Sequence, residues 1–222
     1  MSEAIVVMGV SGSGKTTIGR RIASKLGYAY ADADRYHPEA NVAKMAGGMP
    51  LTDDDRQPWL ERLRRLIEEH AAQGRSLVLS CSALKERYRR VLEEAEPAAR
   101  VHFVYLRGDF DTILTRMRRR KGHYMKASML ESQFRDLEEP EDAVVVGVER
   151  SVPASVQQAL AGLARRGVRA ERAGTAGRGR RREAKHDEGE RHGGERHGGE
   201  HDARHNDARQ NDARQNDEEG KA

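Results

Sequence analysis

One short segment constrains this chain more than any other. Residues 9–16 read Gly-Val-Ser-Gly-Ser-Gly-Lys-Thr and match the phosphate-loop pattern G-x-x-x-x-G-K-[ST] at every position. Residues 5–8, just before the loop, form a short apolar run that is typical of a buried parallel strand. After the loop, apolar side chains recur on one helical face at Ile18, Ile22 and Leu26. A strand, a glycine-rich loop and a helix in this order predict an α/β fold.

The loop suits a polyphosphate because its glycines allow positive φ angles and a close approach of the backbone to a ligand. The amide groups of residues 12–17 and the positive end of the following helix then face the same anion. We expect Lys15 to contact the β- and γ-phosphates of ATP and the Thr16 hydroxyl to ligate Mg²⁺. The alternative is a turn that binds nothing, which the flanking strand and helix disfavour. The residues predicted to hold the nucleotide are Gly9, Ser11, Gly12, Ser13, Gly14, Lys15, Thr16 and Thr17.

Composition divides the chain into a folding unit and a tail. In residues 171–222 the only apolar side chains are alanines, so this segment cannot bury enough surface to offset the entropy of ordering. We therefore expect one α/β domain over residues 1–170 and a disordered, low-complexity tail over residues 171–222. Five of the nine histidines lie in the tail, where weak metal chelation is conceivable, but a plain polar extension explains the composition better.

The cysteine content and the lack of long apolar runs predict a soluble cytoplasmic protein, whereas the charge says little about partners. The net charge of +4 comes from 40 basic and 36 acidic residues, a near balance that does not favour nucleic-acid binding over an anionic substrate. A single cysteine, Cys81, excludes an internal disulfide and suits a reducing compartment. The first residues do not form a signal peptide, and no apolar run approaches the roughly 20 residues of a membrane span.

A carboxylate follows the next expected strand, over residues 28–31. Asp34 lies just past the end of that strand, at the edge where α/β sheets bind ligands. In phosphoryl transfer to an alcohol, a carboxylate accepts the hydroxyl proton and orients the nucleophile, so Asp34 is the candidate catalytic base. The other interpretation is that Asp34 caps the helix that starts near Pro38, a role that Asp32 can also fill.

The remaining patterns alternate between helix and strand. Helices are expected over residues 39–46, from residue 53, over the segment of Tyr88 and Arg89, from about residue 110, and over residues 129–138 and 152–163. Strands are expected over residues 76–80, 101–106 and 143–147. In the helix from residue 53 the buried stripe is predicted to be Trp59, Leu60, Leu63, Leu66 and Ile67.

Basic side chains fall at positions that face this edge of the sheet. Arg56, near the start of its helix, can clamp a carboxylate or simply pair with a neighbouring aspartate. Lys85 follows the strand over residues 76–80, and Arg89 lies on the next helix. Cys81, just before them, is interpreted as a small buried residue rather than a reactive thiol.

A cluster of arginines closes the helix that begins near residue 110. Arg116 and Arg120 are four residues apart and share a face, and a glycine follows at position 122. Such a run is often only a solvated face. Beside a phosphate loop it is better interpreted as a mobile lid whose arginines stabilise charge on the transferring phosphoryl group.

Several blocks of the chain together resemble the gluconokinase family of small P-loop kinases. They occur in the family's order between about residues 4 and 165. The blocks are the phosphate loop, Asp34-x-x-His37-Pro38, Asp53-x-Asp55-Arg56-x-Pro58-Trp59-Leu60, Cys81-Ser82-Ala83-Leu84-Lys85, Arg120-Lys121-Gly122-His123 and Met129-Leu130-x-x-Gln133-Phe134. The tail has no counterpart in the family.

This resemblance implies ATP-dependent phosphorylation of D-gluconate at its 6-hydroxyl, which yields 6-phosphogluconate and ADP. It implies a three-layer α/β fold like that of the nucleoside monophosphate kinases, with a parallel sheet flanked by helices, and commonly a homodimer. It places Arg116 and Arg120 in the lid, where they act with Lys15. It implies a sugar-acid site lined by Asp34, His37, Arg56, Lys85, Arg89 and Gln133.

The residues alone leave other acceptors open. A shikimate or nucleotide kinase of the same fold also needs a base beside several cations. A nucleotide-responsive or nucleic-acid-binding module is the rival from another class, but no aromatic-rich RNA motif or zinc-finger spacing supports it. A GTPase is disfavoured because the chain has no Asn-Lys-x-Asp motif. Neither a membrane nor a nucleic acid is expected as a partner.

Overall fold

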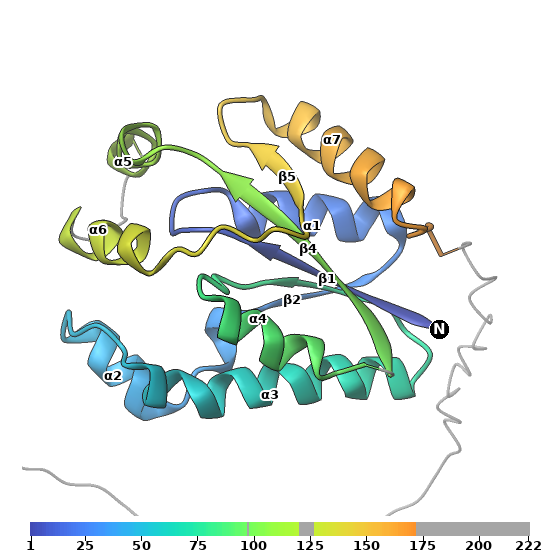
Figure 1. Ribbon diagram of the computed structural model, residues 1–222, viewed down its shortest axis with the longest axis horizontal. Helices are drawn as coiled ribbons and strands as arrows, with labels where there is room; N and C mark the ends of the chain where they lie inside the picture. The colour runs from blue at the N-terminus through green and yellow to red at the C-terminus, as the bar shows by residue number, and fades with distance from the viewer. Residues whose placement is uncertain (97, 120–126, 172–222) are drawn as a thin grey trace, which may run out of the picture. The chain divides into compact units, whose positions relative to one another are not determined.

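A five-stranded parallel sheet forms the centre of the fold, in agreement with the alternating patterns (Figure 1). The computed structural model of the protein describes residues 1–96, 98–119 and 127–171. The strands are β1 (Ser2–Met8), β2 (Ala29–Asp32), β3 (Leu77–Ser80), β4 (Ala99–Arg107) and β5 (Val144–Gly147). Their order in the sheet is β2-β3-β1-β4-β5, so β1 lies in the middle. All seven residues of β1 are buried, which explains its apolar run without alternation.

Helices cover both faces of the sheet and make the fold three-layered (Figure 1). On one face lie α1 (Lys15–Leu26) and α7 (Val152–Arg165), and on the other lie α3 (Asp53–Ala72) and α4 (Glu86–Glu93). The predicted stripe of α3 is confirmed at Trp59, Leu60, Leu63 and Ile67, whereas Leu66 is only partly buried.

The other four helices of the described residues lie toward the carboxyl ends of the strands (Figure 1). They are the 3₁₀ helix η1 (Ala33–Tyr36), α2 (Glu39–Ala46), α5 (Phe110–Arg119) and α6 (Ala127–Asp136). Asp109 precedes α5, and its carboxylate accepts the Thr112 amide at 2.8 Å, as expected of a cap. None of the helices in the described ranges is long and apolar enough to cross a membrane.

A buried arginine braces the turn between β3 and α4. In this turn Ala83 is fully buried and has a φ of 42°, a conformation that costs energy for any residue with a Cβ. Arg89 is only 6% exposed, and its Nη1 donates to the carbonyl oxygens of Ala83, Leu84 and Glu138 at 3.2, 3.0 and 2.9 Å. Arg89 therefore holds the turn against the segment that follows α6.

The folded part extends slightly beyond the predicted boundary at residue 170. The Glu171 amide donates to the Leu26 carbonyl at 2.7 Å, and its carboxylate accepts the Ser76 amide at 3.1 Å. Nearby, the Tyr28 hydroxyl donates to the Arg169 carbonyl at 2.6 Å. Glu171 was assigned to the tail because the segment that it begins has no apolar side chains other than alanine, yet it bonds to the folded unit. The rest of the predicted tail, residues 172–222, lies outside the described residues.

Two truncations test this boundary. A chain that ends at Glu171 keeps all three of these hydrogen bonds, so its melting temperature should stay near that of the full chain. A chain that ends at Val168 loses them and should be less stable by about 1–3 kcal/mol. Thermal and urea unfolding measure both effects, and a large loss of stability in the longer truncation would show that later residues stabilise the domain.

Substitution of Arg89 tests its role as a brace. Arg89→Leu leaves three carbonyl oxygens without their charged donor and should lower the free energy of unfolding by about 2–3 kcal/mol. Arg90→Leu, on the same helix, removes an exposed guanidinium and should change stability little. Equal melting temperatures for the two variants would contradict a bracing role for Arg89.

Candidate active site

The phosphate loop follows β1 directly and has the open backbone that its sequence predicts. Gly12 and Gly14 have φ angles of 81° and 104°, which favour glycine. A Cβ on Gly12 would lie 2.6 Å from Cγ of Met117, so this position also needs a residue without a side chain for packing. Gly14 caps α1, whose first turn therefore points its amide groups toward the loop. This backbone fits a bound phosphate.

Side chains around the loop complete this polar concavity. The Ser13 hydroxyl is buried, and no hydrogen-bond partner for it lies among the described residues. The Lys15 ammonium donates to the Val10 carbonyl at 3.0 Å and so lies over the loop. The Gln133 side-chain oxygen on α6 accepts the Ser11 amide at 2.6 Å, which joins the loop to a helix distant in sequence. A polar atom buried without a partner and a lysine over the loop suit a polyphosphate.

Thr16, the predicted Mg²⁺ ligand, contacts a carboxylate at the end of β2. Its hydroxyl donates to the Asp32 carboxylate at 3.0 Å. The part of the chain that the structure describes contains no cluster of three His, Cys, Asp or Glu side chains able to hold a metal ion. Mg²⁺ bound with a nucleotide needs only one or two protein oxygens because phosphates and waters supply the others. Thr16 and Asp32 together fit that requirement.

Two clefts border the loop. The first, which we call the Arg116 cleft, has a volume of about 390 Å³ and lies between the loop, α5 and the start of α7. It is lined by Gly12, Ser13, Gly14 and Thr17 of the predicted nucleotide set, together with Arg116. The Arg116 guanidinium donates to the Val148 carbonyl after β5. This contact holds Arg116 at the wall of the cleft.

The second cleft, which we call the Asp34 cleft, has a volume of about 240 Å³. It brings the loop together with polar side chains from η1, α3 and α6. Among its lining residues are six from the predicted site: Ser11, Lys15, Asp34, His37, Arg56 and Gln133. The candidate base and the phosphate-loop lysine therefore line one cleft.

An aromatic pair shapes the floor of the Asp34 cleft. The His37 ring stacks on the Trp59 ring, with centroids 4.3 Å apart and an angle of 13° between the planes. The Trp59 indole donates to the Ala33 carbonyl at 2.9 Å, so it also anchors the turn that carries Asp34. Burial lowers the pKa of His37 below its usual value. A neutral imidazole can both donate and accept a hydrogen bond, which suits a polyol.

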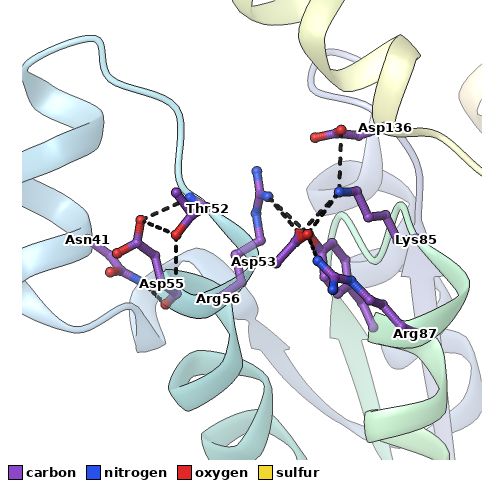
Figure 2. Close-up of polar contacts among 9 residues, drawn as sticks. Asn41, Thr52, Asp53, Asp55, Arg56, Lys85, Arg87 and Asp136 are labelled. Carbon is purple, nitrogen blue, oxygen red and sulfur yellow. Dashed lines mark hydrogen bonds and ion pairs between the residues drawn. The ribbon is translucent and has the colours of Figure 1, made fainter.

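Asp53 lies at the centre of a group of cations beside this cleft (Figure 2). Lys85 Nζ is 3.1 Å from one Asp53 oxygen and 3.6 Å from Asp136. Arg56 Nη1 is 3.7 Å from the Asp53 carboxylate, and Arg87 also pairs with it. Arg56 therefore does pair with a neighbouring aspartate, the alternative that the sequence left open, and it also lines the cleft.

Asp55 forms a separate network that joins α2 to α3 (Figure 2). The Thr52 hydroxyl accepts the Asp55 amide at 3.2 Å, and the Asp55 carboxylate accepts the Thr52 amide at 2.9 Å, which together form a capping box. Lys44 Nζ lies 2.6 Å from the same carboxylate, and Asn41 donates to the Asp55 carbonyl at 2.7 Å. The Lys44 ammonium, with the Thr52 donors, lowers the pKa of Asp55 to about 2. Asp55 therefore positions α2, one wall of the cleft.

Several predicted site residues are placed elsewhere. Arg89 does not line the Asp34 cleft, because its guanidinium binds the backbone of the β3–α4 turn. Lys85 points to Asp53 and Asp136 and is not among the lining residues of the Asp34 cleft. Gly9 lies at the base of the loop, and its amide donates to the Ser82 carbonyl at 3.3 Å. Of the two predicted lid arginines, Arg116 lines the Arg116 cleft, whereas Arg120 lies outside the described residues.

Three polar residues of the site were missed or assigned another role. Asp32 was considered as a cap, and it does accept the Asp34 amide at 3.3 Å, but it also contacts Thr16. Asp53 was assigned to a helix first turn, and Asp136 was not singled out. The acidic triplet before Arg56 was a usable signal for Asp53. Cys81, by contrast, is buried as expected, and burial raises the pKa of its thiol to about 12.

Comparison with known proteins agrees with this geometry. The shikimate kinase family model matches residues 11–161. A probable gluconokinase from Mus musculus is 45% identical over 70% of this chain and 96% of its own length. The thermosensitive gluconokinase of Escherichia coli K12 is 46% identical over 63% of this chain and 73% of its own length.

Among solved structures, the fold matches a gluconokinase from Sinorhizobium meliloti 1021. The TM-score is 0.66 at 45% identity, and the match covers 73% of this chain and 92% of that one. The sequence identity, the family model and the structural match agree with the motif blocks. The chain belongs to the gluconokinase family of P-loop, shikimate-kinase-like kinases.

Proposed function

We propose that this protein transfers the γ-phosphoryl group of ATP to the 6-hydroxyl of D-gluconate, which yields 6-phosphogluconate and ADP. The observation that carries the proposal is that Lys15 of the phosphate loop and Asp34 line the same cleft. A phosphoryl donor held by the loop would thus face an acceptor held beside a carboxylate. Membership of the gluconokinase family supports the choice of acceptor.

The loop and its neighbours would hold the nucleotide. The amides of the loop and of the first turn of α1 bind the phosphates, and Lys15 offsets their negative charge. Arg116, which lines the cleft next to the loop, would stabilise negative charge on the transferring phosphoryl group. Thr16 and Asp32 would hold Mg²⁺, which neutralises charge on the phosphates. Arg120 stays a predicted lid residue.

Asp34 would act as the base. It accepts the proton of the 6-hydroxyl while the hydroxyl oxygen bonds to the γ-phosphorus and the bond to the leaving oxygen of ADP breaks. Trp59 supports this step because it anchors the backbone next to Asp34. The low exposure of Trp59, 2%, leaves that anchor little freedom to move.

The rest of the Asp34 cleft would recognise the sugar acid. Arg56 offers a guanidinium to the carboxylate, and His37 offers a neutral imidazole to a hydroxyl. Gln133 has its side-chain oxygen on the Ser11 amide, so its amide nitrogen remains to donate to the acceptor. Lys85 would join Arg56 after a change of side-chain conformation. Arg89 is left out of this set because it braces the neighbouring turn.

The proposal also covers the cellular compartment and the oligomeric state of the enzyme. A single buried cysteine suits the reducing cytoplasm. A homodimer, which the resemblance implies, stays a prediction that measurement of the mass in solution can test.

An acceptor panel tests the proposed reaction. With ATP and Mg²⁺, release of ADP should require an acceptor and should be fastest with gluconate. Shikimate, related sugar acids and nucleoside monophosphates should give much lower kcat/KM values. A coupled ADP assay makes the comparison, and NMR of the product identifies the phosphorylated hydroxyl. Preference for shikimate or for a nucleotide would refute the proposed acceptor.

Paired substitutions at Asp34 and Asp32 test the division of roles. Asp34→Asn removes the proton acceptor, so kcat should fall by about 10²-fold or more while the KM for ATP changes little. Asp32→Asn removes the partner of Thr16, so its main effect should be a higher Mg²⁺ requirement. Steady-state kinetics at varied ATP and Mg²⁺ separate the two. Turnover near that of the wild type in Asp34→Asn would remove Asp34 from the role of base.

A further inference from the structure

The Asp53 carboxylate binds several cations beside the acceptor site. Lys85 Nζ lies 3.1 and 3.3 Å from its two oxygens, and Arg56 Nη1 lies 3.7 Å away. Arg87 and the Tyr88 hydroxyl also contact it. The Asp53 side chain is about one-third exposed, so these contacts form in a partly desolvated environment. Figure 2 shows the charged side chains converging on this one group from α3 and from the start of α4.

This group of charges is continuous with the Asp34 cleft. Arg56 lines the cleft, and so does Asp136, which lies 3.6 Å from the Lys85 ammonium. The Arg56 guanidinium is also held from behind, because its Nη1 donates to the Tyr88 hydroxyl at 3.0 Å. Two cations able to bind the carboxylate of a sugar acid are therefore already in contact with a carboxylate of the protein.

We propose that Asp53 is an internal competitor of the acceptor carboxylate, which holds Lys85 and Arg56 when no acceptor is bound and thereby sets the affinity for anionic acceptors. This inference rests on the proposed function, since it assumes that the acceptor bears a carboxylate. When the acceptor binds, Lys85 leaves Asp53 and contacts the acceptor.

Lys85 is freer to move than Asp53, so Lys85 is the one that changes position when the acceptor binds. Asp53 is the first residue of α3, and its backbone is fixed by the capping box of Thr52 and Asp55. Lys85 has a long, flexible side chain, and it lies between Asp53 and Asp136 with neither contact shorter than 3.1 Å. Exchange of carboxylate partners by Lys85 therefore requires side-chain rotation alone.

The charge balance explains why such a competitor is useful. Without Asp53, the positive charges of Arg56, Lys85 and Arg87 would lose the carboxylate that they share, and the site would attract many anions. With Asp53 present, the binding free energy of an anion is only the difference between its own contacts with these cations and the Asp53 contacts that it replaces. A small inorganic anion gains little, whereas a sugar acid also contacts the hydroxyl-binding residues of the cleft. Asp53 thus favours selectivity at the expense of affinity.

The first experiment removes the competing charge. In Asp53→Asn the KM for gluconate should fall by about three- to tenfold, while the KM for ATP stays unchanged. Inhibition by inorganic phosphate, competitive with gluconate, should become stronger. Asp54→Asn is the matched control, because Asp54 is the next residue of the same helix turn, is exposed and carries the same charge. Its KM for gluconate should stay near that of the wild type.

The second experiment strengthens the competitor instead. Arg87→Gln removes one cation from Asp53 and leaves the carboxylate more available to Lys85, so the KM for gluconate should rise by about two- to threefold. Arg90→Gln, one turn later on α4 and paired with Glu86, is the control for the loss of a positive charge. In the Asp53→Asn background, Arg87→Gln should have no effect beyond that of Arg90→Gln.

The outcomes separate the competitor from a simple scaffold. If Asp53 only positions the cations, Asp53→Asn should raise the KM for gluconate, and that result, or an unchanged KM, would overturn the inference. Should Asp53→Asn melt far below the wild type, Arg87→Gln alone decides, and an effect equal to that of Arg90→Gln would overturn the inference. A wild-type protein that phosphorylates no carboxylated acceptor would refute the proposed function itself.

Discussion

The arrangement of the site depends on a buried strand that ends in a loop without side chains at its critical positions. All residues of β1 are buried between helices on both faces of the sheet, so the start of the phosphate loop is fixed. Gly12 and Gly14 then take φ angles that favour glycine, and Met117 of α5 fills the space beside Gly12. Because parallel strands all end at one edge, Asp32, Ser82 and the residues after β5 lie around this loop.

Around that fixed loop, the site is assembled from competing charge contacts. Asp55 forms an ion pair with Lys44 and thereby holds α2, whereas Asp53 pairs with Lys85, Arg56 and Arg87. These two carboxylates lie two residues apart and have different tasks, which follow from their positions on the first turn of α3. Asp55 faces back to the cap and is fully engaged. Asp53 faces the cations of the acceptor site, where its contacts can be exchanged.

Local sequence patterns were sufficient to predict the fold and the phosphate loop. They were not sufficient to predict contacts between residues that only the fold brings together. The strands and helices were predictable because each has its own periodicity, and Asp34 because it directly follows a strand. The role of Arg89 was not predictable, since its side chain binds the backbone carbonyls of Leu84 and Glu138, which are far from each other in sequence. The same holds for Glu171, which looks like tail yet binds Ser76 and Leu26. From the sequence alone, the charge of Glu171 suggested an exposed residue, because its two partners could not be identified.

The stacked pair on the floor of the Asp34 cleft gives this enzyme a natural optical reporter. Trp59 is the one tryptophan of the chain, so its emission comes from a single known place. Its ring lies against His37, and both residues line the cleft. Any event that shifts or protonates the imidazole changes the quenching of the indole. Occupancy of the Asp34 cleft can thus be followed in the unlabelled protein.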